Sequence, residues 1–150
     1  MSAPDVSEDV LHHLHYLRTV CGLPAHVDRR GRLAVVIGGK VRAADMPEYW
    51  GYRVKAALAE QGWLGPVLWH PMRRLIFLTG PYPPEEADNH RISSALSKTG
   101  SLIVAPNDVL TLPSPGDDSR GWLSPIRDRF RPNMISVLAA LVKCDRREAR

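Results

Sequence analysis

The apolar positions near the two ends of the chain recur at the spacing of an α-helix. Ser7 is the expected N-cap of a helix predicted over residues 7–21, and Leu14 lies at the centre of its apolar stripe. Leu138 lies at the centre of the matching stripe of a helix predicted over residues 134–143, for which Asn133 is the expected N-cap. We therefore expect two terminal helices that contribute to one common core.

Shorter apolar runs between these helices predict strands. The unbroken run over residues 33–37 is typical of a strand that is covered on both faces. Residues 66–70 and 75–79 flank a short polar connection and predict a hairpin. A strand over residues 101–105 is expected to pair with residues 109–112. The remaining expected strands are residues 25–27, 41–44 and 122–123.

Two more helices are expected among the strands. Asp45 precedes Met-Pro-Glu, a pattern typical of an N-cap and an early-turn proline, so we expect it to cap a helix that ends at Gly62. Residues 85–98 predict another helix, which Gly100 would stop. The charged tail, residues 145–150, is expected to fray.

This alternation of helices and strand pairs predicts a single α+β domain with a mixed or antiparallel sheet and flanking helices. A length of 150 residues suits one core. Within residues 1–150 we expect an N-terminal helix in residues 1–24, a sheet core with two helices in residues 25–125, and a C-terminal helix with a basic tail in residues 126–150.

The composition indicates the class of protein and the compartment in which we expect it. Hydrophobic residues make up 44% and charged residues 24% of the chain, values typical of a globular domain. No apolar run reaches the roughly 20 residues that span a bilayer, and residues 1–9 are polar and acidic, unlike a signal peptide. We expect a cytoplasmic protein without a membrane partner, in which Cys21 and Cys144 are buried thiols.

The net charge of +4 permits an anionic partner without requiring one. The basic residues of the chain gather in two groups that would suit phosphate oxygens, and Phe130 or Trp122 could stack on an unpaired base. Asp28 and Asp128 lie within the same groups, so two ordinary solvated surfaces are the alternative. The candidate nucleic-acid-binding residues are Arg29, Arg30, Arg32, Arg127, Arg129 and Arg131.

No complete catalytic or metal centre is evident in the sequence. His12 and His15 share a helix face with no accompanying ligand at a recognised metal spacing. Lys40 follows two glycines but precedes a predicted strand rather than the Ser/Thr and helix of a phosphate loop. No Gly-x-Ser-x-Gly occurs. We therefore expect no catalytic residues, no metal and no cofactor.

Three segments, taken in order, resemble a known family. Residues 41–47 (Val-Arg-Ala-Ala-Asp-Met-Pro) precede a helix, residues 73–78 (Arg-Arg-Leu-Ile-Phe-Leu) form a basic and apolar strand, and residues 100–106 (Gly-Ser-Leu-Ile-Val-Ala-Pro) follow a helix, with Trp122 after a loop. Their order and spacing are similar to the N-terminal primase/polymerase domain of bacterial bifunctional DNA primase-polymerases, over residues 33–123. The resemblance implies a primase-polymerase-like core.

The departures from that family concern the residues that would carry its chemistry. Asp45 matches the second member of the family's acidic metal-binding pair, whereas Arg42 occupies the place of the first, where a cation would repel a divalent metal. Leu75 stands in the place of the motif histidine, and residues 92–99 contain no acid. The resemblance therefore implies a scaffold that has lost polymerase activity.

These observations leave three interpretations of function. The first is a non-catalytic binding or regulatory module on a degenerate primase-polymerase-like fold, with nucleic acid as its partner through the basic groups. The second is a protein-interaction or self-associating domain, which would bind a protein partner or form a homodimer. The third is an enzyme with a site that the sequence does not reveal.

Overall fold

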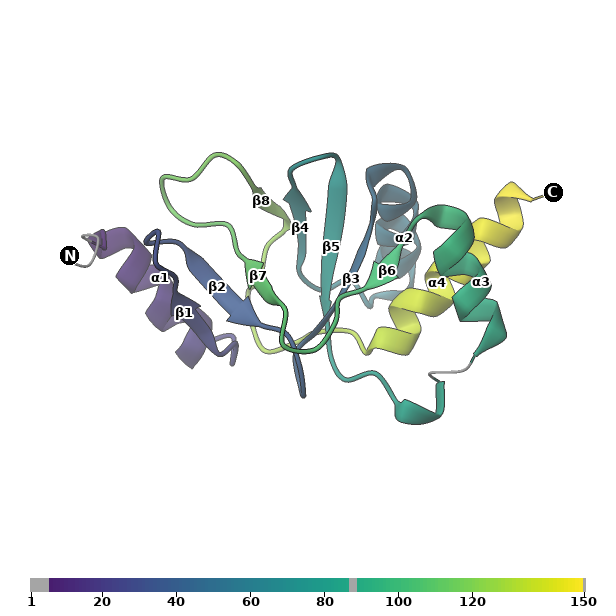
Figure 1. Ribbon diagram of the computed structural model, residues 1–150, viewed down its shortest axis with the longest axis horizontal. Helices are drawn as coiled ribbons and strands as arrows, with labels where there is room; N and C mark the ends of the chain where they lie inside the picture. The colour runs from purple at the N-terminus through teal and green to yellow at the C-terminus, as the bar shows by residue number, and fades with distance from the viewer. Residues whose placement is uncertain (1–5, 87–88, 150) are drawn as a thin grey trace.

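The computed structural model describes residues 6–86 and 89–149 as an α+β fold with four α-helices and two antiparallel sheets (Figure 1). The helices are α1 (Glu8–Thr19), α2 (Glu48–Gln61), α3 (His90–Thr99) and α4 (Met134–Glu148). The strands are β1 (Ala25–Val27), β2 (Leu33–Val36), β3 (Arg42–Pro47), β4 (Val67–His70), β5 (Arg74–Thr79), β6 (Leu102–Ile103), β7 (Val109–Thr111) and β8 (Gly121–Ser124), and a 3₁₀ turn covers Pro84–Glu86.

The larger sheet has the strand order β6-β3-β5-β4-β8, and the smaller one the order β1-β2-β7. The connectivity β3-α2-β4-β5-α3-β6 is that of a split β-α-β motif, with β8 added next to β4. Both crossover helices therefore lie on one face of the larger sheet. Figure 1 shows this sheet as the middle of three layers, with the small sheet and α1 on one side and α2, α3 and α4 on the other.

Each face of the larger sheet has its own hydrophobic core, because side chains alternate along β5. Leu75 and Phe77 belong to the core under the helices, and Ile76 and Leu78 to the core under α1 and the small sheet. The expectation of one common core is therefore wrong. Leu14 and Leu138 are both buried, but they lie in different cores on opposite faces of the sheet.

Local signals predicted several ends of elements correctly. Ser7 and Asn133 are the N-caps of α1 and α4, and their side chains accept hydrogen bonds from Val10 N and Ser136 N. Gly62 and Gly100 end α2 and α3 with φ values of 73° and 69°, a region in which glycine alone carries no steric penalty. These features are confirmed.

Two helices differ from expectation. Residues 84–86 form a separate 3₁₀ turn, and α3 begins only at His90, because the Asn89 side chain accepts from the amides of Arg91 and Ile92 and caps the helix there. The expected helix also includes residues 87–88, which lie outside the described residues. At the C-terminal end of the chain, α4 continues beyond the expected residue 143 to Glu148. The Glu148 carboxylate accepts a hydrogen bond from the Tyr49 hydroxyl at 2.9 Å and pairs with Arg53 at 3.3 Å.

The expected pairing of residues 101–105 with 109–112 is also wrong. β6 pairs with β3, whereas β7 pairs with β2 in the other sheet. A turn closed by the hydrogen bond from Asp108 N to Ala105 O redirects the chain, and Leu110 then packs in the core beneath the small sheet. Burial of Leu110 opposite Val35 selects the distant partner over the adjacent one.

Candidate nucleic-acid interface

A row of polar side chains crosses the end of the larger sheet, on the face opposite the crossover helices. His70 of β4 and Arg74 of β5 are directly paired, and continuing the β4–β8 register past Trp69↔Gly121 places Arg120 next to His70. Adjacent strands lie about 5 Å apart, so the three residues occupy neighbouring backbone positions along this end of the sheet. Trp122 lies one step inward, paired with Leu68. We call His70, Arg74, Arg120 and Trp122 the sheet-end cluster.

Arg74 is fixed by three acceptors. Its Nε donates to Asp45 Oδ1 at 2.7 Å, and its Nη2 donates to Gly100 O at 3.0 Å and to Asp45 O at 3.4 Å. The side chains of Arg74 and Asp45 are 25% and 20% exposed, so the pair is shielded but open on one side to solvent. A planar guanidinium held in this way keeps a fixed orientation towards a ligand.

The expectation that Asp45 caps α2 is wrong. β3 continues through Asp45 to Pro47, and Pro47 stands at the N-cap position without a side-chain hydrogen bond. The Glu48 amide instead donates to Arg73 O at 2.9 Å, so the neighbouring hairpin satisfies the start of the helix. The Asp45 carboxylate remains available for Arg74.

Arg120 is joined to the small sheet through Asp117. The Asp117 carboxylate lies 3.5 Å from Arg120 Nη1 and 3.8 Å from Arg32 Nη1, and it accepts from the Ser119 hydroxyl at 2.6 Å and the Ser119 amide at 3.0 Å. These two bonds from Ser119, helped by Arg120 and Arg32 and opposed by burial, lower the pKa of Asp117. One ionised carboxylate is therefore shared between two arginines.

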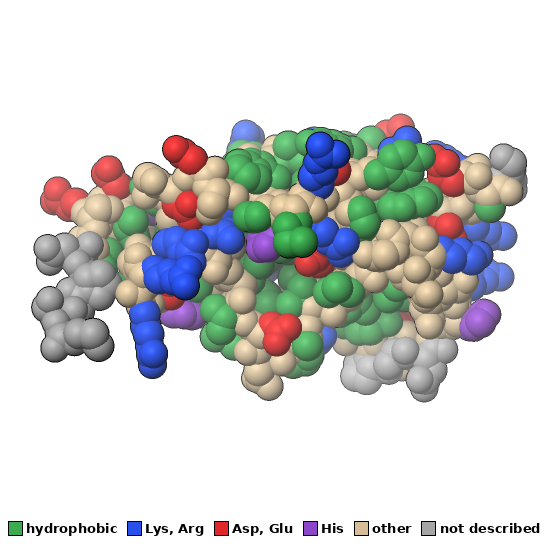
Figure 2. Space-filling view, turned by 45° about the horizontal axis from the view of Figure 1, so that its top comes forward, with side chains coloured by type: hydrophobic (Ala, Val, Ile, Leu, Met, Phe, Trp, Pro, Cys, Tyr) green, Lys and Arg blue, Asp and Glu red, His purple; other side chains and the backbone are tan. Residues whose placement is uncertain are grey.

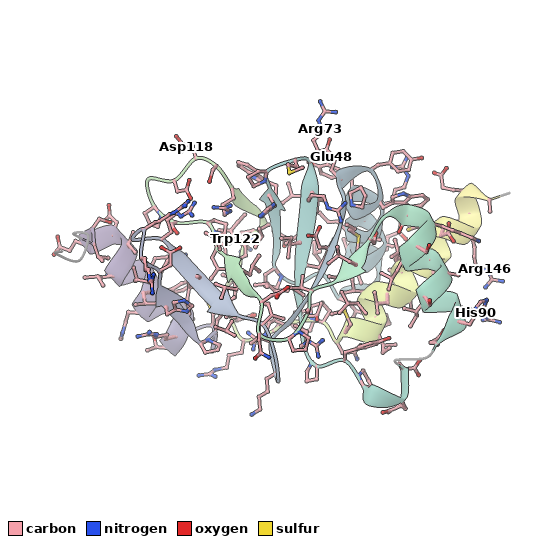
Figure 3. All side chains as sticks on the ribbon, viewed as in Figure 1. Glu48, Arg73, His90, Asp118, Trp122 and Arg146 are labelled. Atoms are coloured by element: carbon pink, nitrogen blue, oxygen red, sulfur yellow. The ribbon has the colours of Figure 1, made fainter. Side chains whose placement is uncertain are left out.

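The Arg120 side chain is only 9% exposed, and its Nε has no hydrogen-bond partner within the described part of the chain. A buried donor without a partner is costly, and the Nε atoms of Arg32 and Arg42 are in the same state. Figure 2 shows basic side chains and a histidine along the middle of this face, and Figure 3 shows Trp122 inside the same region, with Asp118 on the loop above it.

The first predicted group lies beside the sheet-end cluster. Arg29 and Arg30 are exposed in the turn between β1 and β2, where Asp28 accepts from the amides of Arg30 and Arg32 at 2.9 Å each. Arg32 is half-buried and reaches Asp117, as described above. This turn is therefore physically connected to Arg120.

The second predicted group lies at the other end of β1. Arg129 Nη2 donates to Thr19 O at 3.4 Å, and Arg131 Nη1 donates to Cys21 O at 3.1 Å, so both cations complement the C-terminal end of α1. Burial lowers the pKa of Arg131, and the neighbouring Arg129 adds to that effect. Arg127 is exposed and lines a cavity of about 260 Å³ with Phe130.

The histidines and cysteines singled out above form no shared centre. His12 and His15 are exposed on α1, and His13 stacks on Tyr16 with ring centroids 5.8 Å apart. Within residues 6–86 and 89–149, no three His, Cys, Asp or Glu side chains gather as they would around a metal ion. Cys21 and Cys144 are reduced and buried, as expected, and burial raises the pKa of both thiols.

Comparison of the chain with models of protein families, with curated proteins and with solved structures finds no match. The helices of the described residues include none with both the length and the apolar character needed to cross a membrane.

The sequence reasoning missed Arg120, Asp117 and His70 as members of a site. His70 ends the first strand of the predicted hairpin, but Arg74 was expected in the connection, whereas the structure begins β5 at Arg74 and pairs it with His70. The placement of Arg120 next to them depends on β8 adding to β4, a contact between segments about fifty residues apart that no local pattern indicates.

Proposed function

We propose that this protein is a non-catalytic nucleic-acid-binding module, and that a single strand of DNA or RNA lies across the sheet-end cluster. The observation that carries the proposal is the row of His70, Arg74 and Arg120, in which Arg120 holds a buried donor without a partner among the described residues. Arginine forks match phosphate oxygens, and the rings of His70 and Trp122, both half-buried and the latter packed against the core under the small sheet, would stack on unpaired bases. Arg29 and Arg30 extend the basic surface beyond the row.

Local acids limit the strength of such binding. Asp45 and Asp117 each neutralise part of the charge of Arg74, Arg120 and Arg32. Binding is therefore weak, and since phosphates supply most of its energy it depends on salt more than on base sequence. Arg29 and Arg30 are exposed and form no ion pair with an acid of the described residues, so they would dominate the first encounter with a nucleic acid.

The positions of the resembling residues support the absence of catalysis. Arg42 and Asp45 are three residues apart in β3, so their side chains project from opposite faces of the sheet. Even an acid in place of Arg42 would not share a metal ion with Asp45. A degenerate primase-polymerase-like scaffold remains our hypothesis for the origin of the fold.

A fluorescence-anisotropy titration of a labelled single strand tests the proposal. With about four phosphates engaged, log Kd should change with log salt by a slope of about 3 in magnitude. The Arg29→Ala/Arg30→Ala variant should weaken binding and reduce the slope. The matched variant Arg146→Ala/Arg147→Ala removes the same charge from the end of α4 and should change binding less. Absence of binding at low salt in folded protein would refute the proposal.

The second predicted group is tested separately. If Arg127, Arg129 and Arg131 also contact phosphates, replacing all three by alanine should flatten the salt dependence. Because Arg129 and Arg131 hold carbonyls at the end of α1, circular dichroism must first show that this variant is folded.

Protein interaction is the second candidate function, and a groove between α2 and α4 favours it. The groove has a volume of about 250 Å³, and Trp63 on its wall is 48% exposed. Such a partly exposed aromatic residue beside an apolar groove is common at protein interfaces. Light scattering over a range of concentrations would detect a homodimer, and Trp63→Ser should dissociate one formed through this groove.

A further inference from the structure

The groove between α2 and α4 runs along two antiparallel helices that lie side by side (Figure 1). Arg53 near the start of α2 pairs with Glu148 at the end of α4. Trp63, just after α2, lines the groove together with Ser136 near the start of α4. A second cavity of about 270 Å³ adjoins the groove and extends it towards the Arg53–Glu148 pair. The two cavities share the lining residues Ala57, Glu60, Cys144 and Arg147.

Small side chains along the groove leave room for another element to approach closely. Ala57 of α2 and Ala139 and Ala140 of α4 all line it. Trp63 stands at one end of the groove with 48% of its surface exposed. An aromatic side chain beside small ones is a combination that suits the centre of a protein interface, where aromatic residues are enriched and contribute much of the binding energy.

The two walls of the groove carry opposite charges. Glu60 is exposed on the α2 wall, and Lys143 and Arg147 are exposed on the α4 wall. None of these three side chains forms an ion pair with another described residue, whereas Arg53 and Glu148 at the end of the groove already neutralise each other. A complementary occupant therefore presents bases to the α2 wall and an acid to the α4 wall.

A second copy of the chain meets this requirement. A two-fold axis parallel to the helices sets α2 of each copy against α4 of the other at the same level along the groove. Glu60 of one copy then stands beside Lys143 and Arg147 of the other, Trp63 lies against Ala139, and every contact is made twice. The alternative axis, which sets α4 against α4, brings the two basic walls together and is disfavoured by repulsion between like charges.

From this self-complementarity we infer that the protein forms a two-fold homodimer through the α2–α4 groove. The inference rests on protein interaction, the second candidate function, and it names the partner and the arrangement of the helices. The groove and the sheet-end cluster lie on opposite faces of the larger sheet, so dimerisation does not require nucleic acid.

Charge reversal tests the inference by light scattering without nucleic acid. The wild-type protein should change from monomer to dimer as its concentration rises. Glu60→Lys and the double variant Lys143→Glu/Arg147→Glu should each weaken self-association by about tenfold or more, because like charges then face each other. An equimolar mixture of the two variants should associate as the wild type does, since both pairs of facing walls in the mixed dimer are again opposite in charge.

Two further variants serve as matched controls. Glu8→Lys on α1 and Arg91→Glu/Lys98→Glu on α3 make the same exchanges at exposed residues that do not line the groove, and they should leave self-association unchanged. All of the substituted residues are exposed, so every variant should remain folded, which thermal unfolding checks. Recovery of association in the mixture would also exclude misfolding as the cause of dissociation.

The outcomes separate this inference from nucleic-acid binding. A wild-type protein that stays monomeric at every concentration would overturn the homodimer, while the anisotropy titration would still decide nucleic-acid binding by itself. Dimers that persist in both charge-reversal variants would show that the interface lies outside the groove. Variants that dissociate singly and fail to associate when mixed would overturn the pairing of α2 with α4.

Discussion

Arg74 on β5 donates from Nε to the carboxylate of Asp45 on β3 at 2.7 Å, and from Nη2 to the carbonyl of Gly100 at 3.0 Å. One guanidinium thus joins two central strands of the larger sheet to the end of α3. The same guanidinium belongs to the sheet-end cluster, so Asp45 both positions it and competes with any phosphate for it.

Asp45→Asn should therefore have opposite effects on folding and binding. Loss of the charged partner should lower the free energy of unfolding by about 1 kcal/mol. This cost lies between the small contribution of an exposed ion pair and the larger cost of breaking a buried one. Affinity for a single strand should rise, because Arg74 is no longer neutralised. Urea denaturation and anisotropy measure the two effects.

Asp118→Asn is the matched control, since it removes one negative charge from an exposed residue of the neighbouring loop. It should leave the urea midpoint unchanged and raise the affinity less. If the two variants behave alike in both measurements, the Asp45–Arg74 pair has no special role.

The ionisation of Asp117 should make the free energy of unfolding depend on pH. Its pKa in the folded protein lies below the ordinary value of 3.8, through the Ser119 hydroxyl and amide first and then through Arg120 and Arg32. A lowered folded-state pKa contributes stability that is present above the unfolded-state pKa and is lost as pH falls through the folded-state pKa. The wild-type protein should thus lose this contribution as pH falls from above the ordinary value of 3.8 to below the lowered folded-state pKa.

Denaturation at both ends of that pH range measures the loss. Asp117→Asn should show a smaller decrease in the free energy of unfolding over the range, and Ser119→Ala, which removes the largest cause of the shift, should give an intermediate decrease. An identical decrease in all three proteins would show that the Asp117 carboxylate gains nothing from folding.

Arg131 is expected to stabilise the fold through the end of α1. Arg131→Met keeps the apolar stem but removes the hydrogen bond to Cys21 O, which should cost about 1–2 kcal/mol because a partly buried carbonyl loses its donor. Arg127→Met changes an exposed residue of the same segment and should stay within about 0.5 kcal/mol of the wild type. Thermal unfolding of the two variants compares them, and equal stabilities would contradict the structural role of Arg131.

Leu14 and Leu138 should act independently. Each is buried in a different core, so Leu14→Ala and Leu138→Ala should each lower the free energy of unfolding by about 2–5 kcal/mol. Because the larger sheet separates them, the double variant should show the sum of the two effects within about 0.5 kcal/mol. A larger deviation would mean that the two cores are coupled through the sheet.

Local interactions made a large part of the fold predictable. The caps at Ser7 and Asn133 and the glycine ends at Gly62 and Gly100 rest on hydrogen bonds and backbone angles within a few residues. The β4–β5 hairpin is likewise a contact between neighbours in sequence. In each case the interacting groups are already close along the chain, so a short pattern contains the information that is needed.

The candidate site was predictable only in part. Arg29, Arg30 and Arg32 were recognised as a basic group, and the structure connects that group to Arg120 through Asp117. Arg129 and Arg131 carry the same sequence signal, yet they lie against the carbonyls that end α1. Charge along a sequence does not distinguish a cation that faces solvent from one that holds a distant backbone group.

The sequence by itself thus determined most of the elements, the caps at Ser7 and Asn133 and the side chains that share a face of each strand, since helical and strand periodicity and capping are local properties. Only the tertiary structure decided that β7 joins β2, that β8 brings Arg120 beside His70, and that Leu14 and Leu138 lie on opposite sides of one sheet. The period of a strand indicates which residues point the same way, but the element that covers them is selected by burial among segments far apart in the chain.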